Sequence, residues 1–367
     1  MSSNTVALVG CGVIAPAYAH TLAQISSVEV VAVADAFVDR AAALAEQFSI
    51  PKHGALDDIL VDPDIAAIIN LTPPLAHVAV SRQALDAGKH VFSEKPIGVD
   101  LDEGRGLVAH ALDLGLRLGC APDTFLGQGL QTCREIIESG RIGEPVAASG
   151  FMLGSGPESW HPAPDIFYQR GAGPMLDMGP YYLTALVQLL GPARSITGAA
   201  RITHATRTIG SEPRRGEQIP VEVPTHVSSV IEFVSGAIGT LVTSFDVQAS
   251  RYRNIEIYGT EATLSVPDPN TFGGPVRIRG LRDREWEEVP LRATNLAQQR
   301  GIGASDMLWA LRSNRPHRAN ADTALHVLEL MTAAVQASDA GHRIDLMTTC
   351  RPVPLLPEGL APGEFDD

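Results

Sequence analysis

Short β-branched runs alternate with longer helical segments over residues 6–121, and this alternation constrains the fold more than any other feature. The runs are almost continuously apolar, which is typical of parallel strands covered by helices on both faces. Because such crossovers are right-handed, we predict a doubly wound parallel sheet of the α/β class. The predicted strands are 6–10, 30–35, 65–70, 90–94 and 116–121, and the predicted helices between them are 18–25, 39–48, 76–88 and 102–115.

The pattern changes after about residue 122. Apolar and polar residues then alternate with a period of two, and Gly, Asn and Asp punctuate the runs, which predicts a large, open-faced, mostly antiparallel sheet in an α+β domain. The predicted strands are 145–153, 225–234, 237–247, 254–266, 274–281 and 285–291, with helices near 126–138, 179–190, 302–313 and 320–339. The predicted domains are 1–122 and 123–345, followed by an extended arm over 346–367.

Composition excludes several classes of function. The chain has 367 residues and a formal charge of −14, without a Lys/Arg-rich run, so nucleic acid is not expected as a partner. No apolar run approaches the roughly 20 residues that cross a bilayer, and the N-terminus does not resemble a signal peptide. The four cysteines have neither metal-ligand nor disulfide spacing. We therefore expect a cytoplasmic protein with reduced cysteines and no metal site.

The first strand runs into the sequence GCGVIA, residues 10–15. Gly10 permits the tight turn, Gly12 permits close approach of a pyrophosphate, and Ala15 permits packing of the following helix on the strand. A plain strand-to-helix turn is the alternative. The strand before it and the helix after it favour a dinucleotide.

A second cofactor signal follows the second predicted strand. Asp35 is placed to accept hydrogen bonds from ribose hydroxyls, which favours NAD over NADP, and its alternative role is a helix N-cap. Arg40 would instead meet a 2′-phosphate. Later, His77 either reaches the ligand or is an exposed residue at a helix start. The full predicted cofactor set is Gly10, Gly12, Val13, Ile14, Asp35, Arg40, Leu71, Thr72, Pro73, His77, Glu94 and Lys95.

Asp35, TPPLAH at 72–77, AGKHVFSEKP at 87–96 and a later Gly-rich segment that reaches Asp177 together resemble the Gfo/Idh/MocA oxidoreductases. The resemblance extends over at least residues 5–340. It implies that Lys95 lies beside the nicotinamide and the reacting carbinol, held by Glu94 and Pro96 across a Lys–Pro bond that is often cis. A lysine near a cationic nicotinamide should have a lowered pKa, suited to acid–base work. A solvated turn is the alternative role of this segment.

The same resemblance marks Gly171, Gly173 and Asp177, but the family's histidine four positions after the aspartate is here Tyr181. A phenol can also exchange a proton, and this departure resembles the branch of sugar 3-ketoreductases. The resemblance therefore implies the catalytic set Lys95, Tyr181 and Asp177. A tyrosine packed on the core is the alternative.

An aromatic loop, residues 158–170, precedes this segment, and its rings are suited to stacking on a pyranose. Bracing of the loop is the alternative for each residue. Asp123 follows the last predicted parallel strand and is predicted to face the same cleft. The predicted substrate-binding residues are Asp123, Trp160, His161, Tyr168, Arg170, Asp177 and Tyr181.

These features predict an NAD-dependent oxidoreductase acting on a secondary hydroxyl of a sugar, glycoside or cyclitol, with NADP the less favoured cofactor. Two alternatives remain: an NAD-recycling glycosidase that acts through a keto intermediate, and a non-catalytic regulator that senses the dinucleotide. The strands at 225–234 and 237–247 are apolar at alternate positions on both sides. We therefore expect a homodimer or homotetramer through the second sheet.

Overall fold

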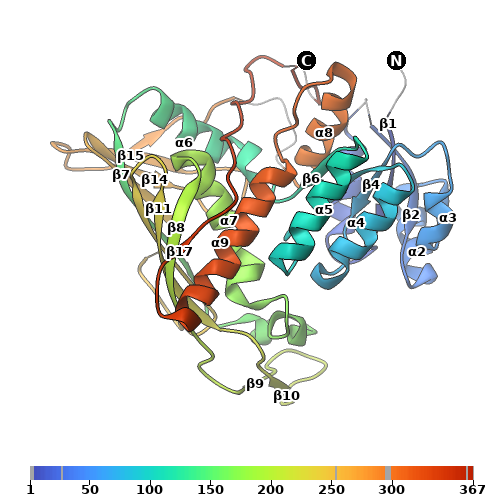
Figure 1. Cartoon of the computed structure of the whole chain (residues 1–367), viewed down its shortest axis with the longest axis horizontal. Coiled ribbons are helices and arrows are strands. Elements are labelled where there is room, and N and C mark those ends of the chain that lie inside the picture. The colour runs from blue at the N-terminus through green and yellow to red at the C-terminus, as the bar shows by residue number, and fades with distance from the viewer. Residues whose placement is uncertain (1–3, 26–27, 253, 294–298, 361–362, 367) are drawn as a thin grey trace. The chain divides into compact units, whose positions relative to one another are not determined.

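The chain forms two compact units in a computed structural model that describes residues 4–25, 28–252, 254–293, 299–360 and 363–366. Unit 1 comprises residues 1–128, 292–325 and 353–367, and unit 2 comprises residues 129–291 and 326–352 (Figure 1). The first boundary lies close to the one expected near residue 122. The later segments differ from expectation, because 292–325 and most of the arm return to unit 1.

Unit 1 is built on a six-stranded parallel sheet with the strand order β3-β2-β1-β4-β5-β6. From the centre of the sheet, β1, β2 and β3 succeed one another toward one edge, and β4, β5 and β6 toward the other edge. The direction in which successive strands are added therefore reverses between β1 and β4. Its strands are β1 (Asn4–Val9), β2 (Val28–Ala34), β3 (Lys52–Gly54), β4 (Ala67–Asn70), β5 (His90–Ser93) and β6 (Leu118–Cys120). The predicted doubly wound parallel sheet is confirmed, and β3 is an additional short strand.

Helices cover this sheet as the apolar strands require. All four residues of β4 are buried, and α4 and α5 pack side by side in the cyan and teal part of Figure 1. The helices of unit 1 are α1 (Ala15–Leu22), α2 (Val38–Phe48), α3 (Leu56–Leu60), α4 (His77–Asp86), α5 (Leu101–Asp113) and α8 (Ile302–Ser313), with 3-10 turns at Pro74–Ala76 and Thr124–Leu126.

Unit 2 contains a nine-stranded sheet with the order β16-β15-β14-β13-β7-β12-β11-β8-β17. Every pairing is antiparallel except β12 with β7, which confirms a mostly antiparallel sheet. Its strands are β7 (Pro145–Leu153), β8 (Ala193–Arg201), β11 (His226–Phe233), β12 (Ile238–Ser244), β13 (Asn254–Gly259), β14 (Ala262–Val266), β15 (Val276–Gly280), β16 (Glu287–Val289) and β17 (Ile344–Asp345). A separate hairpin pairs β9 (Thr206–Thr208) with β10 (Gln218–Pro220).

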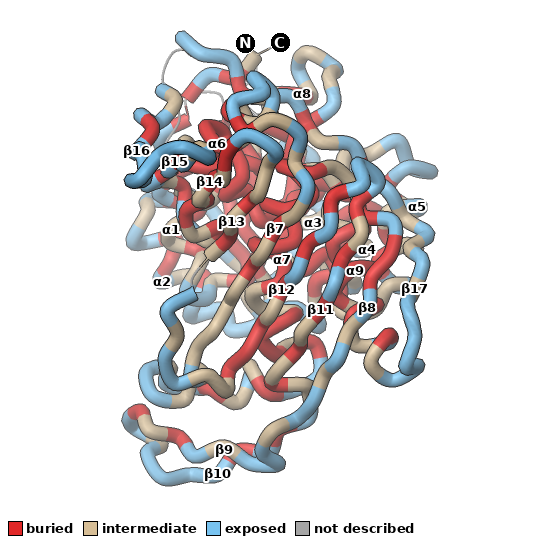
Figure 2. The backbone as a smooth tube through the Cα atoms, turned by 90° about the vertical axis from the view of Figure 1, so that its left-hand side faces the viewer, coloured by how far each residue is buried: buried red, intermediate tan, exposed pale blue. Residues whose placement is uncertain are grey.

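The central strands alternate between buried and partly exposed residues, as the period of two predicts (Figure 2). Helix α7 (Gly173–Leu190) packs on β7, β11 and β12, and its second half is entirely buried. Helix α9 (Ala321–Ala340) crosses β8, where the Ser338 hydroxyl accepts a hydrogen bond from the Ala200 amide. Helix α6 (Gln128–Glu138) also belongs largely to this unit. None of the helices in the described part of the chain is long and apolar enough to cross a membrane.

Candidate functional site

The turn between β1 and α1 lies where the strand order of the parallel sheet reverses. Gly10 has a φ of +99°, and a Cβ there would lie 2.6 Å from the carbonyl carbon of Leu71, so only glycine fits. A Cβ on Gly12 would meet no atom within 4 Å, and Val13 is 96% exposed. One side of the loop is therefore packed against Leu71 and Thr72, which follow β4, and the other side is open. This arrangement fits a dinucleotide pyrophosphate at the start of α1.

Asp35 follows β2 and faces the same turn. Its Oδ2 accepts a hydrogen bond from the Cys11 amide at 2.7 Å, and its Oδ1 accepts one from the Phe37 amide at 2.8 Å. The N-cap of α2 is Phe37, so the alternative role of Asp35 as an N-cap is wrong. A carboxylate has about four lone-pair sites, which leaves acceptor capacity for ribose hydroxyls. The Arg40 guanidinium lies 4.5 Å from the centre of the exposed Phe37 ring, in the same turn.

Cys11 is the half-buried thiol between the two glycines. Burial, and then the Asp35 carboxylate, raise the pKa of Cys11 to about 11. The thiol therefore stays neutral at physiological pH and adds no negative charge where a pyrophosphate would approach.

Polar hydrogen bonds join the loops that follow β4 and β5. The Asn70 side-chain amide donates to the carbonyl of His77 and to the hydroxyl of Ser81, both at 3.0 Å. Its oxygen accepts from the amide and the hydroxyl of Thr72 at 3.2 and 2.6 Å. The His77 ring nitrogens lie 2.6 Å from the carbonyl oxygens of Pro96 and Thr72. The two loops are therefore held in one arrangement.

His77 is only 1% exposed, so the alternative of an exposed residue at a helix start is wrong. Both of its ring nitrogens face carbonyl oxygens of the protein, and its contact with a ligand stays a prediction. Burial lowers its pKa, although the two carbonyls act in the opposite direction, and a neutral imidazole donates to only one of them. Beside it, Leu71 is buried and its amide bonds to the Val9 carbonyl, while Pro73 is exposed.

Lys95 is half-buried, and its peptide bond to Pro96 is cis. The Glu94 carboxylate accepts a hydrogen bond from the Lys95 amide at 2.9 Å and another from the Tyr18 hydroxyl at 2.8 Å. Burial raises the pKa of Tyr18, followed by the charge of Glu94, so the phenol remains a neutral donor. Glu94 holds the backbone of Lys95, and Tyr18 on α1 holds Glu94.

Asp123 is fully buried, and this corrects its predicted role in substrate binding. Its Oδ2 accepts hydrogen bonds from the amides of Gly301 and Gly303 at 2.8 and 3.0 Å. Burial raises the pKa of the carboxyl group, and the two amides and Arg300 oppose this shift. Asp123 therefore stabilises the start of α8 within unit 1.

Unit 2 contains a cavity of about 410 Å³, a size typical of small-ligand pockets. Asp177 on α7 contributes a carboxylate to its wall. Three aromatic rings also line it, from Trp160 and Phe167 in the loop before α7 and from Phe245 after β12. The cavity thus combines a carboxylate with flat apolar surfaces.

The predicted aromatic loop occupies several different environments. Trp160 is 67% exposed and lines the cavity. The His161 ring packs edge-on against Phe167 at 5.0 Å, and its Nδ1 accepts a hydrogen bond from the Ala163 amide, outside the cavity lining. Arg170 is exposed and also lies outside that lining. Of these predicted binding residues, Trp160 is at the cavity.

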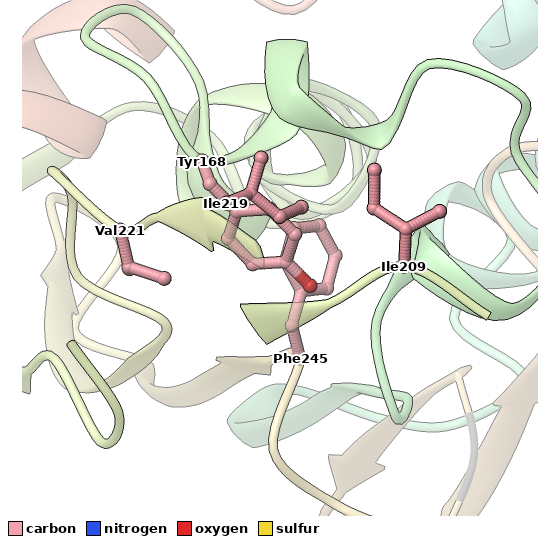
Figure 3. Packing of buried hydrophobic residues seen from close by; sticks show 5 residues of the cluster. All are labelled: Tyr168, Ile209, Ile219, Val221 and Phe245. Carbon is pink, nitrogen blue, oxygen red and sulfur yellow. The ribbon is translucent and has the colours of Figure 1, made fainter. Parts of the chain in front are cut away.

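Tyr168 is fully buried, so we replace its predicted substrate contact with a structural role. Its ring packs with Ile209, Ile219, Val221 and Phe245 (Figure 3). Its hydroxyl donates to the Glu158 carboxylate, and the Arg207 Nε lies 3.3 Å from the same hydroxyl oxygen.

Arg207 is the centre of an ion-pair network behind the cavity wall. Its guanidinium pairs with Glu158 at 3.0 Å and with Asp246 at 3.3 Å, and it also donates to the carbonyls of Ser155 and Phe245. The side chain is only 10% exposed. This network connects the β9–β10 hairpin to two segments of the cavity wall.

Asp177 and Tyr181 lie four positions apart on α7, which places them on one face of the helix. Asp177 is half-buried at the cavity, whereas Tyr181 is 5% exposed and is not among the lining residues. Within the described ranges, no group of three His, Cys, Asp or Glu side chains is arranged to hold a metal ion.

Two positions with structural importance for the site escaped the sequence analysis. Asn70 ends an apolar strand, and a polar residue closing such a run was an available signal. Tyr18 had no comparable signal, because its partner Glu94 is 76 residues away.

Comparison with known proteins places both units. The model described as "Oxidoreductase family, NAD-binding Rossmann fold" matches residues 4–121, and the GFO/IDH/MocA C-terminal domain matches residues 130–265. The chain is 26% identical to 1,5-anhydro-D-fructose reductase of Ensifer adhaerens, covering 94% of this chain and 99% of the relative. It is 26% identical to D-glucoside 3-dehydrogenase of Escherichia coli K12, with coverage of 93% and 97%.

A solved levoglucosan dehydrogenase in complex with NADH has the same fold, with a TM-score of 0.80 and 20% identity over 95% of this chain and all of that one. Two models of one family thus account for the nucleotide-binding sheet of unit 1 and for the open sheet of unit 2. The chain is an NAD-binding oxidoreductase of the Gfo/Idh/MocA family.

Proposed function

We propose that this enzyme transfers a hydride between nicotinamide and a secondary hydroxyl of a sugar, glycoside or cyclitol. The observation that carries the proposal is the cavity of unit 2, which both Asp177 and Trp160 line. A carboxylate orients hydroxyls by accepting their hydrogen bonds, and an aromatic face stacks on the C–H surface of a ring. The relatives named for sugar substrates support the same reaction class.

In oxidation, the C–H bond of the carbinol breaks and its electron pair leaves with the hydride, while the O–H proton goes to the protein. When bound, the nicotinamide supplies the hydride acceptor at C4. Tyr181 takes the hydroxyl proton, Lys95 polarises or relays it, and Asp177 orients the substrate. The product is a ketone, and reduction follows the same steps in reverse.

A screen of pyranosides and inositols with NAD⁺ and NADP⁺ tests this function through absorbance at the nicotinamide band. Net NADH formation on a free sugar or glycoside supports a dehydrogenase. Cleavage of a glycoside without net NADH would instead identify a glycosidase that recycles its cofactor. Dinucleotide binding without turnover of any polyol would identify a sensor.

We expect Asp35 to determine the choice of cofactor. Asp35→Ala removes a charged acceptor of ribose hydroxyls and should weaken NAD⁺ binding by about 1–3 kcal/mol. The difference in affinity between NAD⁺ and NADP⁺ should become smaller in this variant as well. Titration of cofactor binding by calorimetry measures both effects, with Asp39→Ala in the next turn as the control. Wild-type protein that prefers NADP⁺ would contradict this role and point to Arg40.

Lys95 should matter more for turnover than for cofactor binding. Lys95→Ala removes only the side chain, and the Glu94 carboxylate still accepts a hydrogen bond from the backbone amide of residue 95. The glycine turn at residues 10–12 is not altered. We expect kcat to fall by about 10²–10⁴-fold, the usual range for acid–base groups, with little change in NAD⁺ affinity. Steady-state kinetics and a binding titration on the same preparation check this. Near-normal turnover in this variant would contradict the catalytic role and indicate that Glu94–Pro96 is only a structural turn.

Tyr181 is the position where this chain departs from its family. Tyr181→Phe keeps the buried ring but removes the titrating hydroxyl, so kcat should fall by about 10²-fold or more at nearly unchanged stability. The pH–rate profile should lose a limb that belongs to the coupled Lys95–Tyr181 pair. Tyr181→His should restore part of the activity. Wild-type turnover in Tyr181→Phe, together with inactivity of His161→Ala, would move the acid–base role to the aromatic loop.

We further propose that the outer face of the nine-stranded sheet pairs with a second copy of the chain. Val230 on β11 and Ile238 on β12 are 45% and 52% exposed at alternate positions, away from the buried Ile231 and Gly239. Light scattering at micromolar concentration should give a dimer or tetramer. Val230→Lys should dissociate it, while Leu281→Lys, on an exposed turn, should not. A monomeric mass for the wild type would contradict the proposal.

A further inference from the structure

We propose that the cavity of unit 2 selects an uncharged substrate with a large apolar group attached to its hydroxyl-bearing ring, such as an aryl glycoside. This inference rests on the proposed function and narrows its substrate class. It predicts discrimination both against free sugars and against sugars that carry a carboxylate or phosphate.

The lining of the cavity is predominantly apolar. Two methionine thioethers, three aromatic rings and a proline ring form much of its wall: Met152, Met178, Trp160, Phe167, Phe245 and Pro157. A free polyol carries hydroxyls around its whole ring, and each hydroxyl placed against such a surface loses its hydrogen bonds to water. An aryl or alkyl group has no such loss, and unbranched methionines adapt to its shape.

Polar side chains occupy a smaller part of the same wall. They are Asp177, Asn270, Ser155 and Ser159. Such a set can hold a few hydroxyls in a fixed orientation, as ligand pockets commonly do with few polar groups. The lining therefore fits a substrate that combines a few hydroxyls with an apolar group.

Charge excludes anionic substrates for a separate reason. Among the described residues that line the cavity, Asp177 is the one with a charged side chain. Arg207 bonds to the carbonyls of two lining residues, Ser155 and Phe245, but its guanidinium is paired with Glu158 and Asp246. An anionic group would thus meet no cationic side chain among the described lining residues, and the cation behind them is already paired with two carboxylates.

The apolar wall is built into the fold and does not depend on a ligand. Phe245 packs against the Tyr168 ring at 5.9 Å, in the cluster of Figure 3. Tyr168 is in turn fixed through its hydroxyl to Glu158. Because the wall is already ordered, a matching substrate binds without the free-energy cost of ordering it.

The test uses matched glycosides in which one group changes at a time. For each sugar that turns over, kcat/KM is measured for the phenyl glycoside, the methyl glycoside, the free sugar and the phenyl glycosiduronate. The phenyl glycoside should exceed the methyl glycoside by about 10-fold or more, within the range for added apolar contacts in a pocket. The glycosiduronate should be poorer than the phenyl glycoside by about 100-fold. Quenching of Trp160 fluorescence, absent in Trp160→Phe, should rank the same ligands by binding alone.

Two variants connect this preference to the wall. Phe167→Ala and Met178→Ala should each lower the phenyl-to-methyl ratio, whereas Ile166→Ala, 56% exposed and outside the lining, should keep it. Circular dichroism and NAD⁺ binding verify that the variants fold. A ratio that survives both truncations overturns the inference.

Failure of the inference and failure of the proposed function give different results. Equal rates with phenyl and methyl glycosides, or a glycosiduronate used as well as its neutral counterpart, would overturn the inference and leave the dehydrogenase function intact. Absence of turnover with every sugar, glycoside and cyclitol would overturn the proposed function itself.

Discussion

The hydrogen bonds of Asn70 and His77 hold the nucleotide-binding edge of unit 1 together. They connect the end of β4, the start of α4 and the carbonyl of Pro96. Asn70, His77 and Pro96 are buried, and a buried polar group without a partner is costly, so these hydrogen bonds stabilise the observed arrangement of the loops. The position of the Lys95 backbone depends on this arrangement together with the Glu94 carboxylate.

Most of the architecture could be predicted because it follows from local periodicity. The predicted ranges 145–153 and 302–313 coincide with β7 and α8, where apolar spacing and turn residues agree. The sequence analysis did not predict strand β8, because packing against a helix, as well as strand propensity, determines which residues it contains. Gly198 lies in it against α9, where a Cβ would come 2.1 Å from the Ala334 oxygen. The return of 292–325 to unit 1 was also not predictable, since periodicity identifies a helix but not the core it joins.

The same difference between local and long-range signals applies to the candidate site. Gly10 and Asp35 could be predicted from local signals, a turn and a strand end, and Asp177 was implied by the family resemblance; the roles of all three toward cofactor and substrate stay predictions. Asp123 and Tyr168 were predicted to meet substrate, yet partners distant in the sequence occupy their polar atoms. Asp123 binds amides 178 and 180 residues later, and the Tyr168 hydroxyl meets Arg207 across 39 residues. Only the tertiary structure reveals that their polar atoms serve the fold.

Burial separates the charged groups that hold this protein together from those proposed to carry its chemistry. Asp306 is completely buried between Arg315 and Arg318, and Arg207 is enclosed by two carboxylates. Removing one partner of such a buried ion pair would strongly destabilise the fold, so these charged groups have a structural role. Asp35, Lys95 and Asp177 are all half-buried instead. An intermediate environment keeps a charged group accessible to ligand while its surroundings still orient it, as recognition of a cofactor or substrate requires.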